Sequence, residues 1–172
     1  MAHHILIFVS EIVEDILMAA ELGATTVHLH TQNEATGLPT SDFAYWKTII
    51  SSIRKFNPEI IVCASLSGQN ISDPEVKRTP LRCEGEAKPD MASLTTSSLN
   101  FAKSVSVNSP STIDVLAKRI TKVGIKLELE IFDLGMSNAV RYFQKNGLVS
   151  QRDLGQSLWS SADSAALFDF GG

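Results

Sequence analysis

The sequence predicts an α/β fold in which parallel strands alternate with helices, and three observations support this. Segments with helical and extended patterns alternate along most of the chain. Short polar loops join them, as expected for successive βα units that build a parallel sheet. No glycine-rich dinucleotide-binding or phosphate-binding motif follows any predicted strand. Such a sheet is either doubly wound or closed into a barrel, and the lack of nucleotide motifs favours the barrel.

The first helix and the first strand follow each other closely. Apolar residues recur with a helical period over residues 11–24, with Ser10 as a possible N-cap and Gly23 as the stop. The run "TTVHLH", residues 25–30, is rich in β-branched residues and predicts a strand.

A second helix and two further strands occupy the middle of the chain. The segment "FAYWKTIISSIRKF", residues 43–56, predicts a helix that ends before Pro58. The continuous apolar run "EIIVCAS", residues 59–65, is typical of a strand buried on both faces of a parallel sheet. Residues 89–101 predict a short strand and a turn.

The last clear elements are a helix, a strand and another helix. Residues 109–125 predict a capped helix that Gly124 ends, and "KLELEIFD", residues 126–133, predicts a strand. Residues 135–147 predict a helix with Asp133 as its N-cap. The Ser- and Gly-rich sequence after this helix predicts no clear strand.

Composition limits the class of protein. The 172 residues, 44% apolar and 20% charged, suit a single globular domain. A net charge of −4 with scattered lysines and arginines disfavours nucleic acid and anionic membranes as partners, and no apolar run approaches the roughly 20 residues that cross a bilayer. The N-terminus lacks the features of a secretory signal. With Cys63 and Cys83 as reduced thiols, we expect a cytoplasmic protein.

Two histidines are the first candidate site. Side chains alternate along a strand, so His28 and His30 point to the same side. This spacing suits two ligands of one zinc ion, although a catalytic zinc site needs a third protein ligand. The alternative is that the histidines only form hydrogen bonds within the fold.

Two glutamates form a second pair. Glu128 and Glu130 alternate with leucines and therefore share one face of their strand. If that face lies inside the barrel, each carboxylate needs a metal, an ammonium group or hydrogen-bond donors. If it faces solvent, the two are ordinary surface charges. The loop that follows residues 59–65 offers hydroxyl and backbone N–H groups suited to a carboxylate, or is a simple turn.

Taken together, "GATTVHLH", "CASLSG", "KPDMASLTTSSLNF" and "KLELEIFDLGM" resemble, in order and spacing, the β-keto acid cleavage enzyme family, which includes the 3-keto-5-aminohexanoate cleavage enzymes of lysine fermentation. The resemblance covers about residues 10–149. It implies a zinc-dependent (β/α)8 barrel that forms a homo-oligomer. It also implies exchange of an acyl group between a β-keto acid and acetyl-CoA, giving acetoacetate and a new acyl-CoA.

The resemblance also implies roles for particular residues. His28 and His30 match the zinc-binding histidines, and Glu130 matches the catalytic acid that meets the substrate's amino group, with Glu128 as the substitute assignment. The remaining expected substrate contacts are loop residues: Ser65 and Gly68 for the carboxylate, and Ser98 and Asn100.

Family members are longer than this chain, which departs from their pattern after about Val149. We therefore expect a partial (β/α)8 TIM-barrel-like fold, with an incomplete βα-barrel domain at residues 1–149 and a divergent tail at 150–172. The family's third zinc ligand, a glutamate, is expected to lie beyond the matching part, and residues 1–9 leave little room for a first strand and its loop. The alternatives are a non-catalytic relative that binds a metal or a small acid or serves as an interaction domain, and an unrelated flavodoxin-like domain.

Overall fold

The computed structural model describes residues 8–66, 71–100 and 105–150, and the backbone of residues 154–158 and 165–168. In chain order the elements are α1 (Val9–Glu21), β1 (Thr26–Leu29), α2 (Phe43–Phe56), β2 (Ile61–Ser65), α3 (Pro74–Lys77), β3 (Met91–Thr95), β4 (Leu99–Asn100), β5 (Val105–Ser106), α4 (Pro110–Lys122), β6 (Lys126–Ile131), α5 (Leu134–Lys145), β7 (Leu154–Leu158) and β8 (Ala165–Phe168). Two short 3-10 turns, Thr79–Arg82 and Gly85–Ala87, precede β3. None of the described helices has the length and apolar character of a membrane span.

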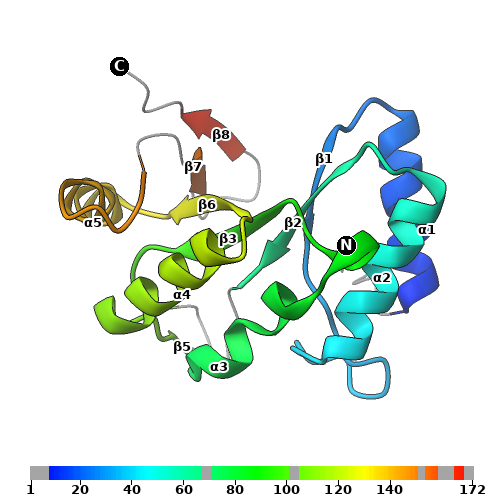
Figure 1. The fold of residues 1–172 in the computed structure, drawn as a ribbon, viewed down its shortest axis with the longest axis horizontal. Helices are drawn as coiled ribbons and strands as arrows, with labels where there is room; N and C mark the ends of the chain where they lie inside the picture. The colour runs from blue at the N-terminus through cyan, green and yellow to red at the C-terminus, as the bar shows by residue number, and fades with distance from the viewer. Residues whose placement is uncertain (1–7, 67–70, 101–104, 151–153, 159–164, 169–172) are drawn as a thin grey trace.

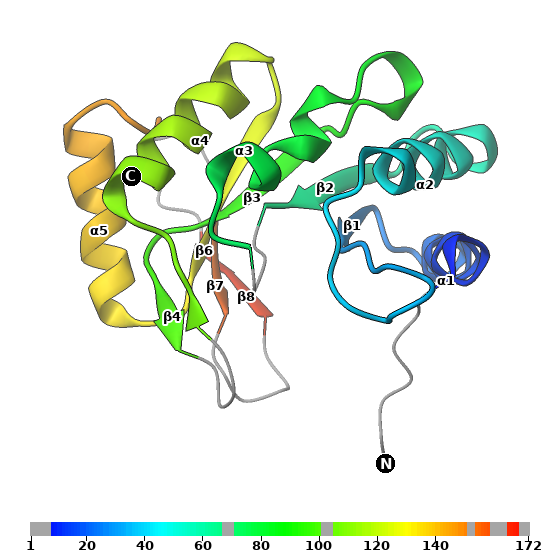
Figure 2. The same cartoon turned by 90° about the horizontal axis from the view of Figure 1, so that it is seen from below.

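The main sheet has six strands in the order β1-β2-β3-β6-β7-β8 (Figure 1). The first five strands are parallel, and β8 pairs antiparallel with β7. Helices α1 and α2 lie beside β1 and β2, whereas α4 and α5 lie beside β3 and β6 (Figure 2). Since β1 and β8 end the strand order without pairing to each other, the described sheet is open. This confirms the predicted α/β fold of parallel βα units as a partial barrel.

Two predictions about local structure are wrong. The chain after Gly147 does form strands, because the free edge of β6 supplies backbone partners to β7 and this pairing overrides the weak strand propensity of "LGQSL". Ser10 does not cap α1, which already begins at Val9. The N–H groups of Phe8 and Val9 instead donate to carboxylate oxygens of Glu11 and Glu34, at 3.3 Å each.

The other predicted helix ends are confirmed. Helix α2 spans the predicted residues 43–56. The Asp133 carboxylate caps α5 by accepting a hydrogen bond from Met136 N at 2.8 Å. Gly23 and Gly124 follow α1 and α4 with φ values of 101° and 67°, a backbone region that favours glycine.

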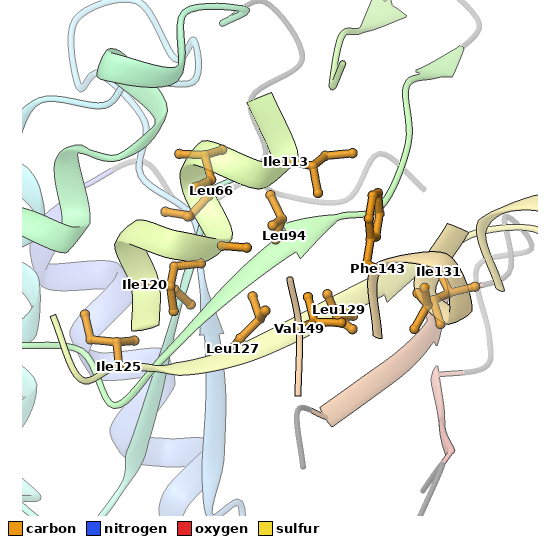
Figure 3. Close-up of a cluster of buried hydrophobic side chains, with 14 of the residues drawn as sticks. Leu66, Leu94, Ile113, Ile120, Ile125, Leu127, Leu129, Ile131, Phe143 and Val149 are labelled. Atoms are coloured by element: carbon orange, nitrogen blue, oxygen red, sulfur yellow. The ribbon is translucent and has the colours of Figure 1, made fainter. Parts of the chain in front are cut away.

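Two apolar clusters cover one face of the sheet. In the larger cluster, Ile113 and Ile120 of α4 face Leu94 of β3 and Leu127 of β6 (Figure 3). The second cluster joins α1 and α2 to β1 and β2, and its strand residues include Leu29, Val62 and Ala64. Because side chains alternate along each strand, the residues between these apolar ones point to the opposite face of the sheet.

Candidate active site

The face of the sheet opposite the helices carries a row of polar side chains. In the parallel register, His28 on β1 pairs with Cys63 on β2. On the next strands, Ser93 on β3 pairs with Glu128 on β6, and Thr95 pairs with Glu130. The sheet therefore brings together side chains from four strands that are far apart in the chain.

Glu130 is a buried carboxylate with hydrogen-bond donors on both oxygens. Its residue is 3% exposed. Ser93 Oγ donates to Glu130 Oε1 at 2.7 Å, and Thr95 Oγ1 donates to Glu130 Oε2 at 2.6 Å. The two hydroxyls offset the cost of burying the charge. Of the two alternatives left open by the sequence, Glu130 therefore lies on a buried face and not among the surface charges.

His28 lies between the two carboxylates. Its Nδ1 is 3.4 Å from Glu128 Oε2, and its Nε2 is 3.7 Å from Glu130 Oε1. The same Nε2 lies 3.3 Å from Ser93 Oγ. Cys63 Sγ donates to Glu128 Oε2 at 2.8 Å. Each nitrogen of the His28 ring therefore faces its own carboxylate.

These contacts shift the acid–base properties of the groups. Burial lowers the pKa of His28, but the hydrogen bond to Glu128 and the charges of Glu130 and Glu128 outweigh it and raise the pKa above the ordinary value of 6.5. Burial raises the pKa of Glu128, but hydrogen bonds from His28 and Cys63 and the charge of His28 lower it below 4.5. Burial, together with Glu128, raises the pKa of the Cys63 thiol.

His30 behaves differently from His28. Its ring stacks on the His28 ring, with the centroids 5.1 Å apart and the planes 23° from parallel, so the two rings do lie on the same side of the chain. Burial and the neighbouring charge of His28 lower the pKa of His30, against a smaller opposite effect of Glu130. His30 therefore favours the neutral state, the form in which imidazole binds a metal.

The other predicted substrate contacts lie on neighbouring segments. Ser65 is buried at the end of β2, opposite Ser93. Gly68 lies outside the described residues. Ser98 and Asn100 lie outside the main sheet: Ser98 directly precedes β4, and Asn100 belongs to β4, which pairs with β5. The Ser98 hydroxyl accepts a hydrogen bond from Asn108 N at 2.9 Å.

Cys63 and Thr95 had no predicted role at the site. Cys63 lies two residues before Ser65, which was predicted to contact the substrate, and Thr95 lies two residues after Ser93, which shares its face of β3. The period of two along a strand is the signal that could have identified them. No signal in the sequence indicated the buried Lys77. Its Nζ donates to Val107 O at 3.0 Å and to Asn108 Oδ1 at 2.5 Å.

Among the described residues, His28, Cys63 and Glu128 form a group with one donor atom each, all within 4.8 Å of one another. Imidazole nitrogen, thiolate sulfur and carboxylate oxygen are the donors that zinc takes in proteins. The chemistry of this donor set therefore fits a zinc ion.

In the metal-free chain, the His28–Glu128 pair is expected to add stability in a limited range of pH. The pKa of His28 is higher in the folded chain than its ordinary value of 6.5. Its contribution to stability is therefore complete below pH 6.5 and is lost as the pH rises through the raised pKa of the folded chain. The pKa of Glu128 is lower in the folded chain than its ordinary value of 4.5. Its contribution is therefore complete above pH 4.5 and is lost as the pH falls through the lowered pKa of the folded chain. Urea unfolding with chelator present should show His28→Gln costing on the order of 1 kcal/mol near pH 5.5, and less near pH 9. A cost that is independent of pH would contradict the ion pair.

Comparison with known proteins decides the family. The family model described as beta-keto acid cleavage enzyme matches residues 1–165. The chain belongs to the beta-keto acid cleavage enzyme family. It is 40% identical over 130 residues to a 3-oxoadipate:acetyl-CoA acetyltransferase of Cupriavidus necator, covering 76% of this chain and 44% of that protein. It is 31% identical over 144 residues to a 3-keto-5-aminohexanoate cleavage enzyme of Fusobacterium nucleatum, covering 83% and 51%.

Solved structures agree with this membership in the beta-keto acid cleavage enzyme family at the level of the fold. The apo structure of ObcA superposes with a TM-score of 0.77 at 18% identity, over 94% of this chain and 39% of that chain. A ternary complex of ObcA with a C4-CoA adduct and oxalate gives a TM-score of 0.72. The chain spans about half the length of the curated relatives that it matches. The family match excludes the unrelated flavodoxin-like domain.

Proposed function

We propose that this chain contributes to the active site of a zinc-dependent β-keto acid cleavage enzyme. In this reaction the acyl group of a β-keto acid, such as 3-keto-5-aminohexanoate, is transferred to coenzyme A, which gives a new acyl-CoA. The acetyl group of acetyl-CoA is transferred to the two-carbon acid unit that the keto acid releases, which gives acetoacetate. The observation that carries the proposal is the convergence of two buried carboxylates, Glu128 and Glu130, on His28. The names of the relatives, which act on keto acids and acetyl-CoA, support it.

The resemblance assigns the zinc ion to His28 and His30, whose rings lie on one side of the chain. When bound, zinc would polarise the keto oxygen as a Lewis acid. The side chain of His28 is 28% exposed, so a metal at its ring would be accessible to a small substrate. Ser93 and Glu130, which face the Nε2 of His28, would hold the ring in position.

The remaining polar residues are proposed to bind and orient the keto acid. Glu130 would pair with the amino group of a cationic substrate. Glu128 is the alternative assignment for this role. Ser65, with Gly68, would hold the substrate carboxylate. Ser98 and Asn100 would supply further hydrogen bonds from the hairpin that follows β3.

An acyl-exchange assay tests the function. The chain is incubated with zinc, acetyl-CoA and a set of β-keto acids, including 3-keto-5-aminohexanoate and 3-oxoadipate, and acetoacetate is measured. Formation of acetoacetate supports the proposal. No turnover in the presence of bound zinc favours the second candidate, a non-catalytic relative that binds a metal or a small acid or serves as an interaction domain.

Replacing Glu130 with glutamine is expected to act on cationic substrates selectively. The neutral amide keeps the size of the side chain and loses the charge, which removes about 1.5–3 kcal/mol of interaction with an ammonium group and lowers kcat/KM about 10- to 150-fold. A substrate without an amino group should lose less. The measurement is kcat/KM for both substrates, and Glu59→Gln, a change at an exposed glutamate, is the control. Equal losses for the two substrates would contradict the assigned role.

We also propose that the chain forms a homo-oligomer in the cytoplasm. The order of the sheet supports association, because β1 pairs only with β2 among the described strands and its other edge is open to further pairing.

A further inference from the structure

We propose that Lys77 is a positioning residue of the substrate site, which acts through Asn108 to hold the Ser98 hydroxyl in place as a hydrogen-bond donor. The inference rests on the proposed function in taking Ser98 as a substrate contact. It adds two residues that act without touching the substrate: Lys77, the last residue of α3, and Asn108, which directly precedes the N-cap of α4.

The pair of strands β4 and β5 has little backbone pairing of its own. Two residues of each strand pair, with Leu99 opposite Ser106 and Asn100 opposite Val105. These strands form a separate two-stranded sheet that does not join the six-stranded sheet. An isolated pair of strands is at best marginally stable in water. The position of Ser98, which directly precedes β4, therefore depends on side chains that tie this pair to the rest of the fold.

Asn108 ties the two strands together. It is buried and lies just after β5. Its backbone N–H donates to Ser98 Oγ at 2.9 Å. Its side-chain Nδ2 donates to Ser97 O at 3.3 Å and to Ser106 Oγ at 3.4 Å. One residue therefore contacts both the segment that leads into β4 and the strand β5.

Lys77 fixes the orientation of the Asn108 amide. The lysine is 2% exposed, and its Nζ donates to Asn108 Oδ1 at 2.5 Å and to Val107 O at 3.0 Å. Because an ammonium group has donors and no acceptor, the amide turns its oxygen to Lys77 and its NH2 group to Ser97 O. Burial lowers the pKa of Lys77, and the charge of Glu130 acts in the opposite direction, so the lysine lies within electrostatic reach of the proposed catalytic carboxylate.

The hydrogen bond from Asn108 N determines what Ser98 can offer a ligand. A hydroxyl has one proton and two acceptor lone pairs. The backbone N–H takes up acceptor capacity of the exposed Ser98, so the hydroxyl can use its proton to donate to a ligand. The keto and carboxylate oxygens of a β-keto acid are acceptors of this kind. Without Lys77, the Asn108 amide loses the partner that orients it, and the Ser98 donor is held less firmly.

Amide hydrogen exchange and ligand titration test this role without an activity assay. The full-length chain with zinc is compared with Lys77→Met, Ser98→Ala and the double variant that carries both changes. Lys122→Met, at an exposed lysine of α4, is the matched control. Asn108→Ala interrupts the same link and serves if Lys77→Met does not fold. Exchange of the amides in β3 and β6 reports whether each variant keeps the fold, and acetoacetate, titrated by calorimetry, is the ligand.

Lys77→Met should raise the exchange rate of Asn108 N–H at least about tenfold and leave β3 and β6 unchanged, whereas Lys122→Met should change neither. The Kd for acetoacetate should rise about 2- to 12-fold in Lys77→Met, as for the loss of one hydrogen bond. In the Ser98→Ala background, Lys77→Met should change Kd by less than about twofold, because Lys77 acts through Ser98.

Two results would overturn the proposal and leave the proposed function standing, provided that the wild type binds acetoacetate. The first is an unchanged exchange rate of Asn108 N–H in Lys77→Met. The second is an equal rise in Kd with and without the Ser98 hydroxyl, which would show that Lys77 acts on the fold in general. A wild-type chain that binds no acetoacetate would overturn both proposals.

Discussion

Replacing His28 with alanine is expected to abolish the thermal stabilisation that zinc gives to the chain. A ligand present at 100 times its Kd adds about 2.7 kcal/mol to the folded state. For a chain of this size, each kcal/mol raises Tm by about 2–4 °C, so zinc should raise the Tm of the wild type by roughly 5–10 °C. His28 belongs both to the donor group with Cys63 and Glu128 and to the histidine pair with His30, and its loss leaves too few donors for a stable site.

Differential scanning calorimetry with and without zinc measures this effect. Magnesium serves as the control ion, because the sulfur and nitrogen donors around Glu128 suit it poorly, and it should leave Tm unchanged. Glu59→Gln, at an exposed position, serves as the control variant and should keep the full zinc shift. The same zinc shift in His28→Ala as in the wild type would show that the ion binds elsewhere.

Replacing Ile120 with alanine is expected to destabilise the fold more strongly than His28→Gln does. Ile120 is fully buried between α4 and the strands β3 and β6. Removing three side-chain carbons at such a position costs about 2–5 kcal/mol, through lost apolar burial and the cavity that remains. Urea unfolding should show this loss, and Tm should fall by roughly 4–20 °C.

Val115→Ala is the matched control for this change. Val115 lies on the same helix with 45% of its surface exposed, so its truncation should change the free energy of unfolding by no more than about 0.5 kcal/mol. Similar losses for the two variants would mean that α4 does not pack against the sheet as described. Because α4 packs against β3 and β6, which carry Ser93, Glu128 and Glu130, loosening of the helix should also weaken zinc binding.

Residues with strong local patterns could be predicted from the sequence. The segment of residues 43–56, which Pro58 follows, and the cap at Asp133 predicted α2 and the start of α5. The alternation around Glu128 and Glu130 predicted their shared face, because a strand's period of two does not depend on its neighbours. The family resemblance to beta-keto acid cleavage enzymes, drawn from four motifs, is confirmed by the match over residues 1–165.

Features that depend on pairing between distant segments could not be predicted in this way. Strand β7 forms because β6 offers it an edge, and "LGQSL" carries little strand signal of its own. The hydrogen bond of Cys63 depends on Glu128, which lies 65 positions away in the chain and is brought to it by the order of the strands. An expectation of reduced thiols from cysteine count alone says nothing about such a contact.

The parallel register has a consequence for how this site could change over evolution or by design. Neighbouring strands are held about 4.8 Å apart by main-chain hydrogen bonds, so the scaffold that carries His28, Cys63 and Glu128 does not depend on which side chains occupy it. An exchange of one donor, for instance sulfur for oxygen at position 63, would alter the preference among ions while the location stays the same. The backbone thus fixes where the donor side chains lie, and the preference among metal ions can change by single substitutions.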